Sequence, residues 1–184
     1  MILSNKVKHP LHKKIYSILE KELGNIGLLG DKACFIKANS NIPFFIKDNK
    51  SNATEITNVD ILFYKKNNSG VNKVKLVCEI EESDRTPIRI FGKYYAAENS
   101  RYWKDPESKT GKLIPLNKDY YFLQILLDDY ESKSNKKMQF KFINQCLEKD
   151  LRKKYKIISG SLSEFDTRKK KERVLVDFLR NNIL

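Results

Sequence analysis

Apolar residues follow helical spacing at both ends of the chain and strand-like spacing in the middle. Residues 10–23 carry apolar side chains at positions 11, 15, 18, 19 and 23, and Gly24 follows. This spacing predicts an amphipathic helix that stops at the glycine. Residues 167–182 predict a second helix, which begins with lysines and becomes apolar from Val174 onwards.

Apolar runs in the middle of the chain predict the strands of a sheet. Residues 58–64 and 73–82 flank a polar segment that contains Gly70, which predicts an antiparallel hairpin. Residues 120–127 are nearly all apolar, as expected for a central strand buried on both faces. Residues 34–36 predict a further short strand.

Two more helices are predicted beside these strands. Thr86 followed by a proline predicts a helix start, and the helix is expected to run to about residue 103. Its predicted buried side comprises Ile88, Phe91 and Tyr95. A later amphipathic stretch, residues 138–151, is expected to turn Phe142, Cys146 and Leu147 inwards.

These elements predict an α/β (α+β) fold, in which a mixed central sheet is flanked by helices. At 184 residues the chain is expected to form one domain. Its core would span about residues 10–130, and a basic helical part would occupy about 133–184.

Charge favours a polyanionic partner, most simply nucleic acid, because the formal net charge is +13. Of the basic residues, 29 are lysines and 7 are arginines. A/T-rich coding sequences also favour lysine, so part of the positive charge could reflect base composition instead of nucleic-acid binding. The distribution is more informative than the total. Residues 133–173 hold 14 Lys/Arg and 5 Asp/Glu, which predicts a segment that follows phosphates.

Other features narrow the class of protein. No window approaches 18 consecutive apolar residues, and the first residues lack a secretory hydrophobic region, so a soluble, cytoplasmic protein without membrane contact is expected. The three cysteines are far apart in apolar surroundings and are interpreted as reduced core residues. His9 and His12 are spaced i, i+3 and could bind a metal, but beside Pro10 and close to the N-terminus a solvated role is the expectation.

Carboxylates inside the apolar runs are the candidate chemistry. Asp60 lies in the first strand of the hairpin, and Glu79 and Glu81 lie in the second. Side chains at i and i+2 share one face of a strand, so all three can converge. Burying uncompensated charge is costly, and a divalent metal could offset that cost. The alternative is an edge strand whose solvated face alternates acidic and apolar residues.

Asp60, the apolar run 76–78, Glu79 and Glu81 resemble the motif of the PD-(D/E)xK nuclease superfamily. The resemblance implies a restriction-endonuclease-like αβββαβ core, covering roughly residues 10–130. Two positions depart from the motif: Val59 replaces the proline, and Glu81 stands where the lysine normally lies. Some restriction endonucleases of this superfamily carry E-x-E at that place.

The resemblance also implies a metal site. Asp60, Glu79 and the Ile80 carbonyl would hold Mg²⁺, for which Mn²⁺ could substitute. Glu81 would bind a second metal or accept the proton of the attacking water. Alternatively, Lys93 could replace the missing lysine in space. Glu20 in the first helix resembles an additional acid that some relatives contribute to the site. Glu20 and Lys93 could each instead be ordinary solvated residues on a helix surface.

The implied function is that of a Mg²⁺-dependent DNA endonuclease, most simply a homodimeric type II restriction enzyme that cuts a short duplex site. The alternatives are a structure-specific repair or recombination nuclease, similar to a junction resolvase, and an inactive nucleic-acid-binding protein of the same fold. Loop 104–118 would reach a DNA groove. The residues expected to contact DNA are Arg85, Arg89, Arg101, Lys136, Lys137, Lys169 and Lys170.

Overall fold

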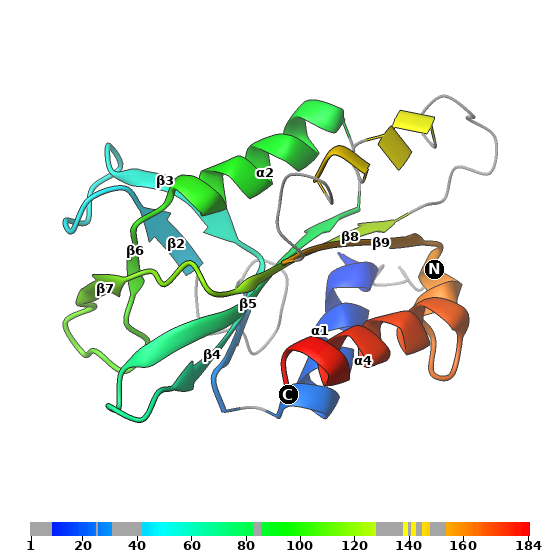
Figure 1. Ribbon diagram of the computed structural model, residues 1–184, viewed down its shortest axis with the longest axis horizontal. Helices are drawn as coiled ribbons and strands as arrows, with labels where there is room; N and C mark the ends of the chain where they lie inside the picture. The colour runs from blue at the N-terminus through cyan, green and yellow to red at the C-terminus, as the bar shows by residue number, and fades with distance from the viewer. Residues whose placement is uncertain are drawn as a thin grey trace, which may run out of the picture.

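The computed structural model describes residues 9–24, 26–30, 42–82, 86–127, 138–139, 141–142, 145–147 and 154–184 (Figure 1). The strand predicted at 34–36 lies outside the described residues. The same holds for three of the predicted DNA contacts, Arg85, Lys136 and Lys137. Within the described part of the chain, no helix has the length and apolar character needed to cross a bilayer.

The main sheet has five strands in the order β1-β4-β5-β8-β9. The β1–β4 and β4–β5 pairs are antiparallel, whereas β5–β8 and β8–β9 are parallel, so the sheet is mixed as the sequence predicted. The β4–β5 pair is the predicted hairpin. The bounds are β1 (Leu28–Gly30), β4 (Ile61–Lys66), β5 (Asn72–Glu81), β8 (Tyr121–Leu127) and β9 (Tyr155–Gly160).

A second sheet of four antiparallel strands, in the order β3-β2-β6-β7, was not predicted from the sequence. Its core includes Phe44 and Trp103, which are fully buried and lie opposite each other across the β2–β6 pair. The predicted strand at 58–64 is divided at Asp60, where the chain passes from this sheet into the main one. The bounds are β2 (Ile42–Phe45), β3 (Glu55–Val59), β6 (Tyr102–Lys104) and β7 (Leu113–Pro115).

Helices cover both faces of the main sheet (Figure 1). One core contains residues of α1 and α4 together with every second residue of β5, including Cys78 and Ile80. The other core contains residues of α2 with the alternate residues of the sheet, including Val77. The helical elements are α1 (Pro10–Leu23), α2 (Pro87–Asn99), the 3₁₀ turn η1 (Leu162–Phe165) and α4 (Lys170–Asn182).

Main-sheet elements and their helices follow the order α1-β1-β4-β5-α2-β8, which is the predicted αβββαβ order. The second sheet is built from two insertions into that order: β2 and β3 precede β4, and β6 and β7 precede β8. The C-terminal strand β9 extends the main sheet, and α4 packs beside α1. Residues 154–184 therefore contribute to both cores of the main sheet.

The buried side of α2 differs from the prediction. Ile90, Tyr94 and Ala97 face the sheet, whereas Ile88 and Tyr95 are 85% and 50% exposed. The helix has apolar residues on both stripes, so the pattern alone did not select the correct one. It also ends at residue 99, not near 103, because Ser100 adopts extended backbone angles and the chain continues into β6.

The predicted helix at 138–151 lies partly in the described residues. Its residues 138–139, 141–142 and 145–147 are helical. Leu147 is buried as predicted, but Phe142 is 64% exposed, so its predicted inward orientation is wrong. The C-terminal helix begins at Lys170, three residues later than predicted.

Candidate active site

Asp60 is fixed at the corner between the two sheets. The β4–β5 register pairs Ile61 with Cys78, which places Asp60 beside the next residue of β5. Its Oδ2 atom accepts a hydrogen bond from the backbone N–H of Ile80, at 2.8 Å. The Asp60 side chain is only 15% exposed, so the carboxylate is held against the end of β5 rather than in open solvent.

Glu79 and Glu81 point to the α2 side of β5, as alternation along a strand predicts. Glu79 is fully buried, and Glu81 is 3% exposed. Parallel pairing aligns Glu79 with Gln124 of β8, which is also fully buried. The strand therefore carries two acids into an interior layer, where an uncompensated carboxylate would be costly.

Lys93 of α2 supplies a positive charge at this point. Its Nζ lies 2.7 Å from Oε2 of Glu79, and its side chain is 23% exposed. Gln124 fixes the helix that carries Lys93, because its Nε2 donates a hydrogen bond of 3.0 Å to the Ile90 carbonyl. Tyr155 in turn donates its hydroxyl hydrogen to Oε1 of Gln124. The lysine is thus positioned by buried contacts one turn away.

Electrostatics differ sharply between the two central acids. Burial would raise the pKa of Asp60, but the hydrogen bond with His12, the charge of Lys93 and the Ile80 N–H outweigh it and lower the pKa. For Glu79, burial raises the pKa well above its usual range and the charge of Asp60 adds to this, although Lys93 opposes both. Burial would lower the pKa of Lys93, but the charges of Glu79 and Asp60 raise it.

This difference means that Asp60 and Glu79 lie close enough to disfavour two negative charges together. The lowered pKa of Asp60 favours its charged form, the raised pKa of Glu79 favours its neutral form, and the raised pKa of Lys93 favours the ammonium. A shared proton or a bound cation are the two ways to relieve such a pair.

Glu81 does not share this arrangement. Its Oε2 lies 3.4 Å from Nε of Arg89. Asp60, Glu79 and Glu81 do not bring three ligand atoms within 4.8 Å of one another; among the described residues, the group that does so is His9, His12 and Glu82. The prediction that all three carboxylates share one ion therefore does not match the structure. The pair Asp60 and Glu79 is what the fold assembles.

The pair offers a suitable donor set for a hard divalent cation. Oε1 of Glu79 is buried and has no hydrogen-bond partner, so it is a polar atom whose burial is not yet compensated. The N–H and C=O groups of one strand residue point to the same edge, so the Ile80 carbonyl faces the Asp60 side of β5. Two carboxylates and one carbonyl are ligands that Mg²⁺ accepts, with water completing its shell.

His12 is a site residue that the sequence analysis placed wrongly. It was expected to be solvated, but it is 5% exposed and its Nε2 lies 3.7 Å from Oδ2 of Asp60. Its place three residues before Ile15 and seven before Leu19, both core residues of α1, is the signal that could have found it. Glu20 lies two turns further along α1 and is exposed, so it does not reach Asp60.

The predicted DNA-contacting residues that the structure describes are exposed. Arg89 is 48% exposed and ion-paired with Glu81, which places it at the rim of the acid site. Arg101 precedes β6, and Lys169 and Lys170 mark the start of α4. The predicted loop at 104–118 contains the short strand β7.

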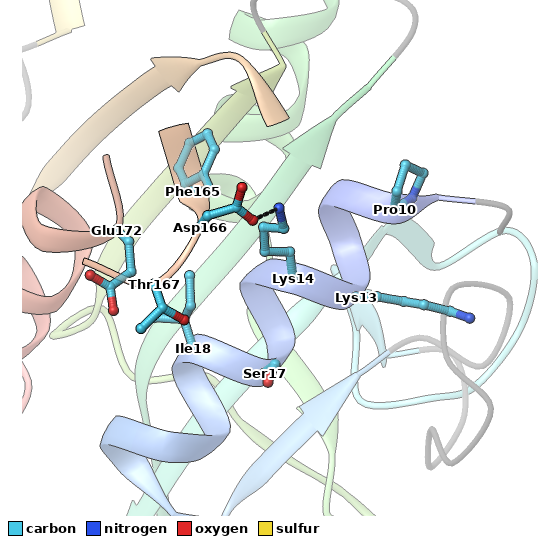
Figure 2. A pocket seen from close by; sticks show the side chains of 9 residues that line it. All are labelled: Pro10, Lys13, Lys14, Ser17, Ile18, Phe165, Asp166, Thr167 and Glu172. Carbon is cyan, nitrogen blue, oxygen red and sulfur yellow. Dashed lines mark hydrogen bonds and ion pairs between the residues drawn. The ribbon is translucent and has the colours of Figure 1, made fainter. Parts of the chain in front are cut away.

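A separate groove of about 350 Å³ lies between α1 and the η1–α4 connection (Figure 2). The Lys14 ammonium contacts the Asp166 carboxylate and the Leu162 carbonyl, while Lys13 extends away from the other side chains drawn. Glu172 also lines the groove. Because charges of both signs line it, this groove is a poor match for a polyanion.

Comparison with protein-family models, curated proteins and solved structures gives no match to this chain. The geometry itself provides the buried carboxylate of Glu79, whose pKa is raised, and the carboxylate of Asp60, whose pKa is lowered. Lys93 contacts Glu79. All three lie where β5, α2 and the junction of the two sheets meet.

Proposed function

We propose that this chain is a Mg²⁺-dependent DNA endonuclease of the PD-(D/E)xK type. The single observation that carries the proposal is the 2.7 Å contact between Lys93 and Glu79, with Asp60 beside them. An acid at the start of β4, an acid on β5 and a lysine are the functional groups of that superfamily's motif. Here the lysine comes from α2 instead of from the strand.

Hydrolysis of a phosphodiester requires a deprotonated water and stabilisation of charge on the phosphate and the leaving oxygen. Asp60, Glu79 and the Ile80 carbonyl would hold the ion. When bound, Mg²⁺ supplies Lewis-acid stabilisation of the phosphate charge. Asp60, with its lowered pKa, would bind the ion as a carboxylate, and Glu79, with its raised pKa, would have to give up a proton to do so.

Lys93 has two roles in this proposal. Its ammonium holds one oxygen of Glu79, which would leave the second oxygen for the ion. Because it is partly exposed, it can also donate a hydrogen bond to the attacking water or to a phosphate oxygen. Glu81 would serve as the proton acceptor or stay paired with Arg89, since it lies apart from the metal pair.

DNA is the proposed substrate because the net charge is +13 and Arg89 lies at the rim of the site. A type II restriction enzyme is the form we favour. It would act in the cytoplasm as a homodimer, so that each subunit cuts one strand of a palindromic site.

Two other functions remain in the same fold. A structure-specific nuclease, similar to a junction resolvase, would use the same residues on branched DNA. The glutamate at position 81, where the superfamily has a lysine, supports an inactive nucleic-acid-binding protein. The contact of Lys93 with Glu79 weakens this hypothesis, because it supplies a lysine beside the acid.

The test is digestion of a large sequenced plasmid with Mg²⁺, followed by mapping of the product ends. Discrete fragments with a common end sequence are expected, and Asp60→Ala should abolish them while DNA binding persists. Selective cutting of four-way junctions would instead favour the structure-specific function. If neither substrate is cut, or if Asp60→Ala cuts as well as the wild type, the proposal is wrong.

A further inference from the structure

The start of α1 and the end of β5 bring a second set of metal-binding side chains together, on the face of β5 opposite to Glu79. His9, His12 and Glu82 each offer one ligand atom, and these atoms all lie within 4.8 Å of one another. The three side chains are 46%, 7% and 12% exposed, so the cluster is mostly buried but can be reached from the His9 side.

Two nitrogen–oxygen separations in the cluster have the size found between ligand atoms of a tetrahedral ion. Nδ1 of His9 lies 3.3 Å from Oε2 of Glu82, and Nδ1 of His12 lies 3.3 Å from its Oε1. Zinc binds imidazole nitrogen and carboxylate oxygen at about 2.0–2.2 Å, which places tetrahedral ligand atoms about 3.3–3.5 Å apart. The two contacts go to different oxygens of Glu82, and the ligand atoms of all three residues lie within 4.8 Å, so side-chain rotations would be needed to bring them around one ion.

Surrounding contacts hold two of the three ligands in place. Oε1 of Glu82 accepts the backbone N–H groups of Leu11 and His12, at 2.6 and 3.0 Å, which fixes the carboxylate at the start of α1 and leaves Oε2 towards His9. When Nδ1 of His12 faces the cluster, its Nε2 faces Oδ2 of Asp60 at 3.7 Å. Metal-binding imidazoles usually direct their second nitrogen at a carboxylate in this way.

We propose that His9, His12 and Glu82 bind one Zn²⁺-class divalent ion, with a fourth position open to water. Two imidazoles and a carboxylate are a donor set for zinc, cobalt or nickel, whereas Mg²⁺ prefers oxygen ligands. The site is thus distinct in chemistry from the Asp60–Glu79 pair, and the proposal does not depend on nuclease activity. The ion would fasten the first turn of α1 to the end of β5.

A competing explanation is an ion pair without metal, in which protonated His9 and His12 neutralise Glu82. The two explanations differ in what the protein does with an added ion. Only the metal site takes up one equivalent of Co²⁺ in a tetrahedral environment, which gives intense visible absorption. An ion-paired cluster would leave Co²⁺ with the weak spectrum of the octahedral aqueous ion.

The experiment is a Co²⁺ titration of the full chain, freed of metal and carrying no histidine tag, monitored by visible absorption. Glu79→Gln serves as the background, so that the Asp60–Glu79 pair does not bind the probe. In that background we expect one equivalent of tetrahedral Co²⁺, displaced by Zn²⁺ and accompanied by a rise in Tm. Adding His9→Ala should weaken the affinity at least tenfold, as should Glu82→Gln.

His9→Ala is the decisive variant because His9 is half exposed and its loss should leave the fold intact, which circular dichroism checks. Asp119→Asn, a substitution of an acid that is 75% exposed, is the matched control and should bind Co²⁺ unchanged. Absence of tetrahedral absorption in the Glu79→Gln protein would overturn the proposal. So would an affinity that His9→Ala does not alter.

Discussion

Nζ of Lys93 lies 2.7 Å from Oε2 of Glu79, although one residue belongs to a helix and the other to the interior of the main sheet. The contact places a cation against a fully buried carboxylate, and the charge of Asp60 acts on both. A lysine that only solubilised the helix would not be directed into this layer. Under the proposed function, this relationship makes Lys93 the residue that would replace the lysine missing at position 81.

Replacing this lysine should impair catalysis more than stability. Lys93→Met removes the ammonium that we propose acts on the attacking water or the phosphate, so the single-turnover cleavage rate should fall by about 10²-fold or more. Cleavage of a labelled duplex at saturating enzyme measures this rate. Lys47→Met, which removes an exposed lysine, should stay within about twofold of the wild type. Equal losses in both variants would show that Lys93 contributes only general charge.

Moving the lysine from position 93 to position 81 tests whether a lysine can perform the same role from either position. Glu81 and Lys93 interact electrostatically across the site. The double variant Glu81→Lys/Lys93→Met restores the spacing of the superfamily motif, so it should recover at least tenfold of the activity that Lys93→Met loses. Initial cleavage rates of the two variants provide the comparison. A double variant no more active than the single one would mean that a lysine on β5 cannot replace Lys93.

The raised pKa of Glu79 predicts how the stability of the metal-free protein depends on pH. A carboxyl that holds its proton more tightly when folded stabilises the folded state below its unfolded pKa, and this contribution is lost as pH rises through the folded pKa. As pH rises from the unfolded glutamate pKa of about 4.3 towards the raised folded pKa, wild type should therefore lose more free energy of unfolding than Glu79→Gln, by at most about 1.4 kcal/mol per pH unit.

Urea unfolding at several pH values in EDTA measures this difference. Asp60 does not contribute to this difference in pH dependence, because its lowered pKa reduces stability only as pH falls into the acidic range. Identical pH slopes for the two proteins would show that Glu79 is not protonated in the metal-free fold. Saturating Mg²⁺ should also flatten the wild-type slope, since the ion replaces the proton.

Arg89 should contribute to DNA affinity and not to chemistry. It is half exposed at the rim of the acid site, where a phosphate can compete with Glu81 for its guanidinium. Arg89→Ala should weaken binding to all duplexes by a similar factor and reduce the slope of log K against log salt by about 1. Fluorescence anisotropy over a range of salt concentrations measures both. An unchanged slope would remove Arg89 from the DNA interface.

Sequence pattern predicted the parts of the site that depend on strand alternation. The hairpin and the common face of Glu79 and Glu81 follow from the two-residue period, and the register then places Asp60 beside Glu79. Lys93 was identified only as an alternative, because its direction depends on the rotation of α2. The stripe that actually packs, Ile90 and Tyr94, carries Lys93 towards β5.

The rest depended on long-range contacts that a local pattern does not contain. Asp60 interrupts what looked like one strand, because the chain changes sheets there. His12 was assigned to solvent from its closeness to the N-terminus, yet the end of β5 covers it and Glu82 caps the first turn of its helix. The pairing of Glu81 with Arg89 likewise depends on how α2 lies against β5.

The central claim is that Asp60 and Glu79 together bind a divalent ion. Calorimetric titration of the metal-free protein with Mn²⁺ tests it most directly, with Asp60→Asn, Glu79→Gln and the exposed control Asp119→Asn in the same series. The His9→Ala background keeps the second cluster from binding the ion. We predict one site that is weakened at least tenfold in Asp60→Asn and Glu79→Gln and unchanged in Asp119→Asn. Mn²⁺ binding that neither Asp60→Asn nor Glu79→Gln alters, or no binding at all, would contradict the account.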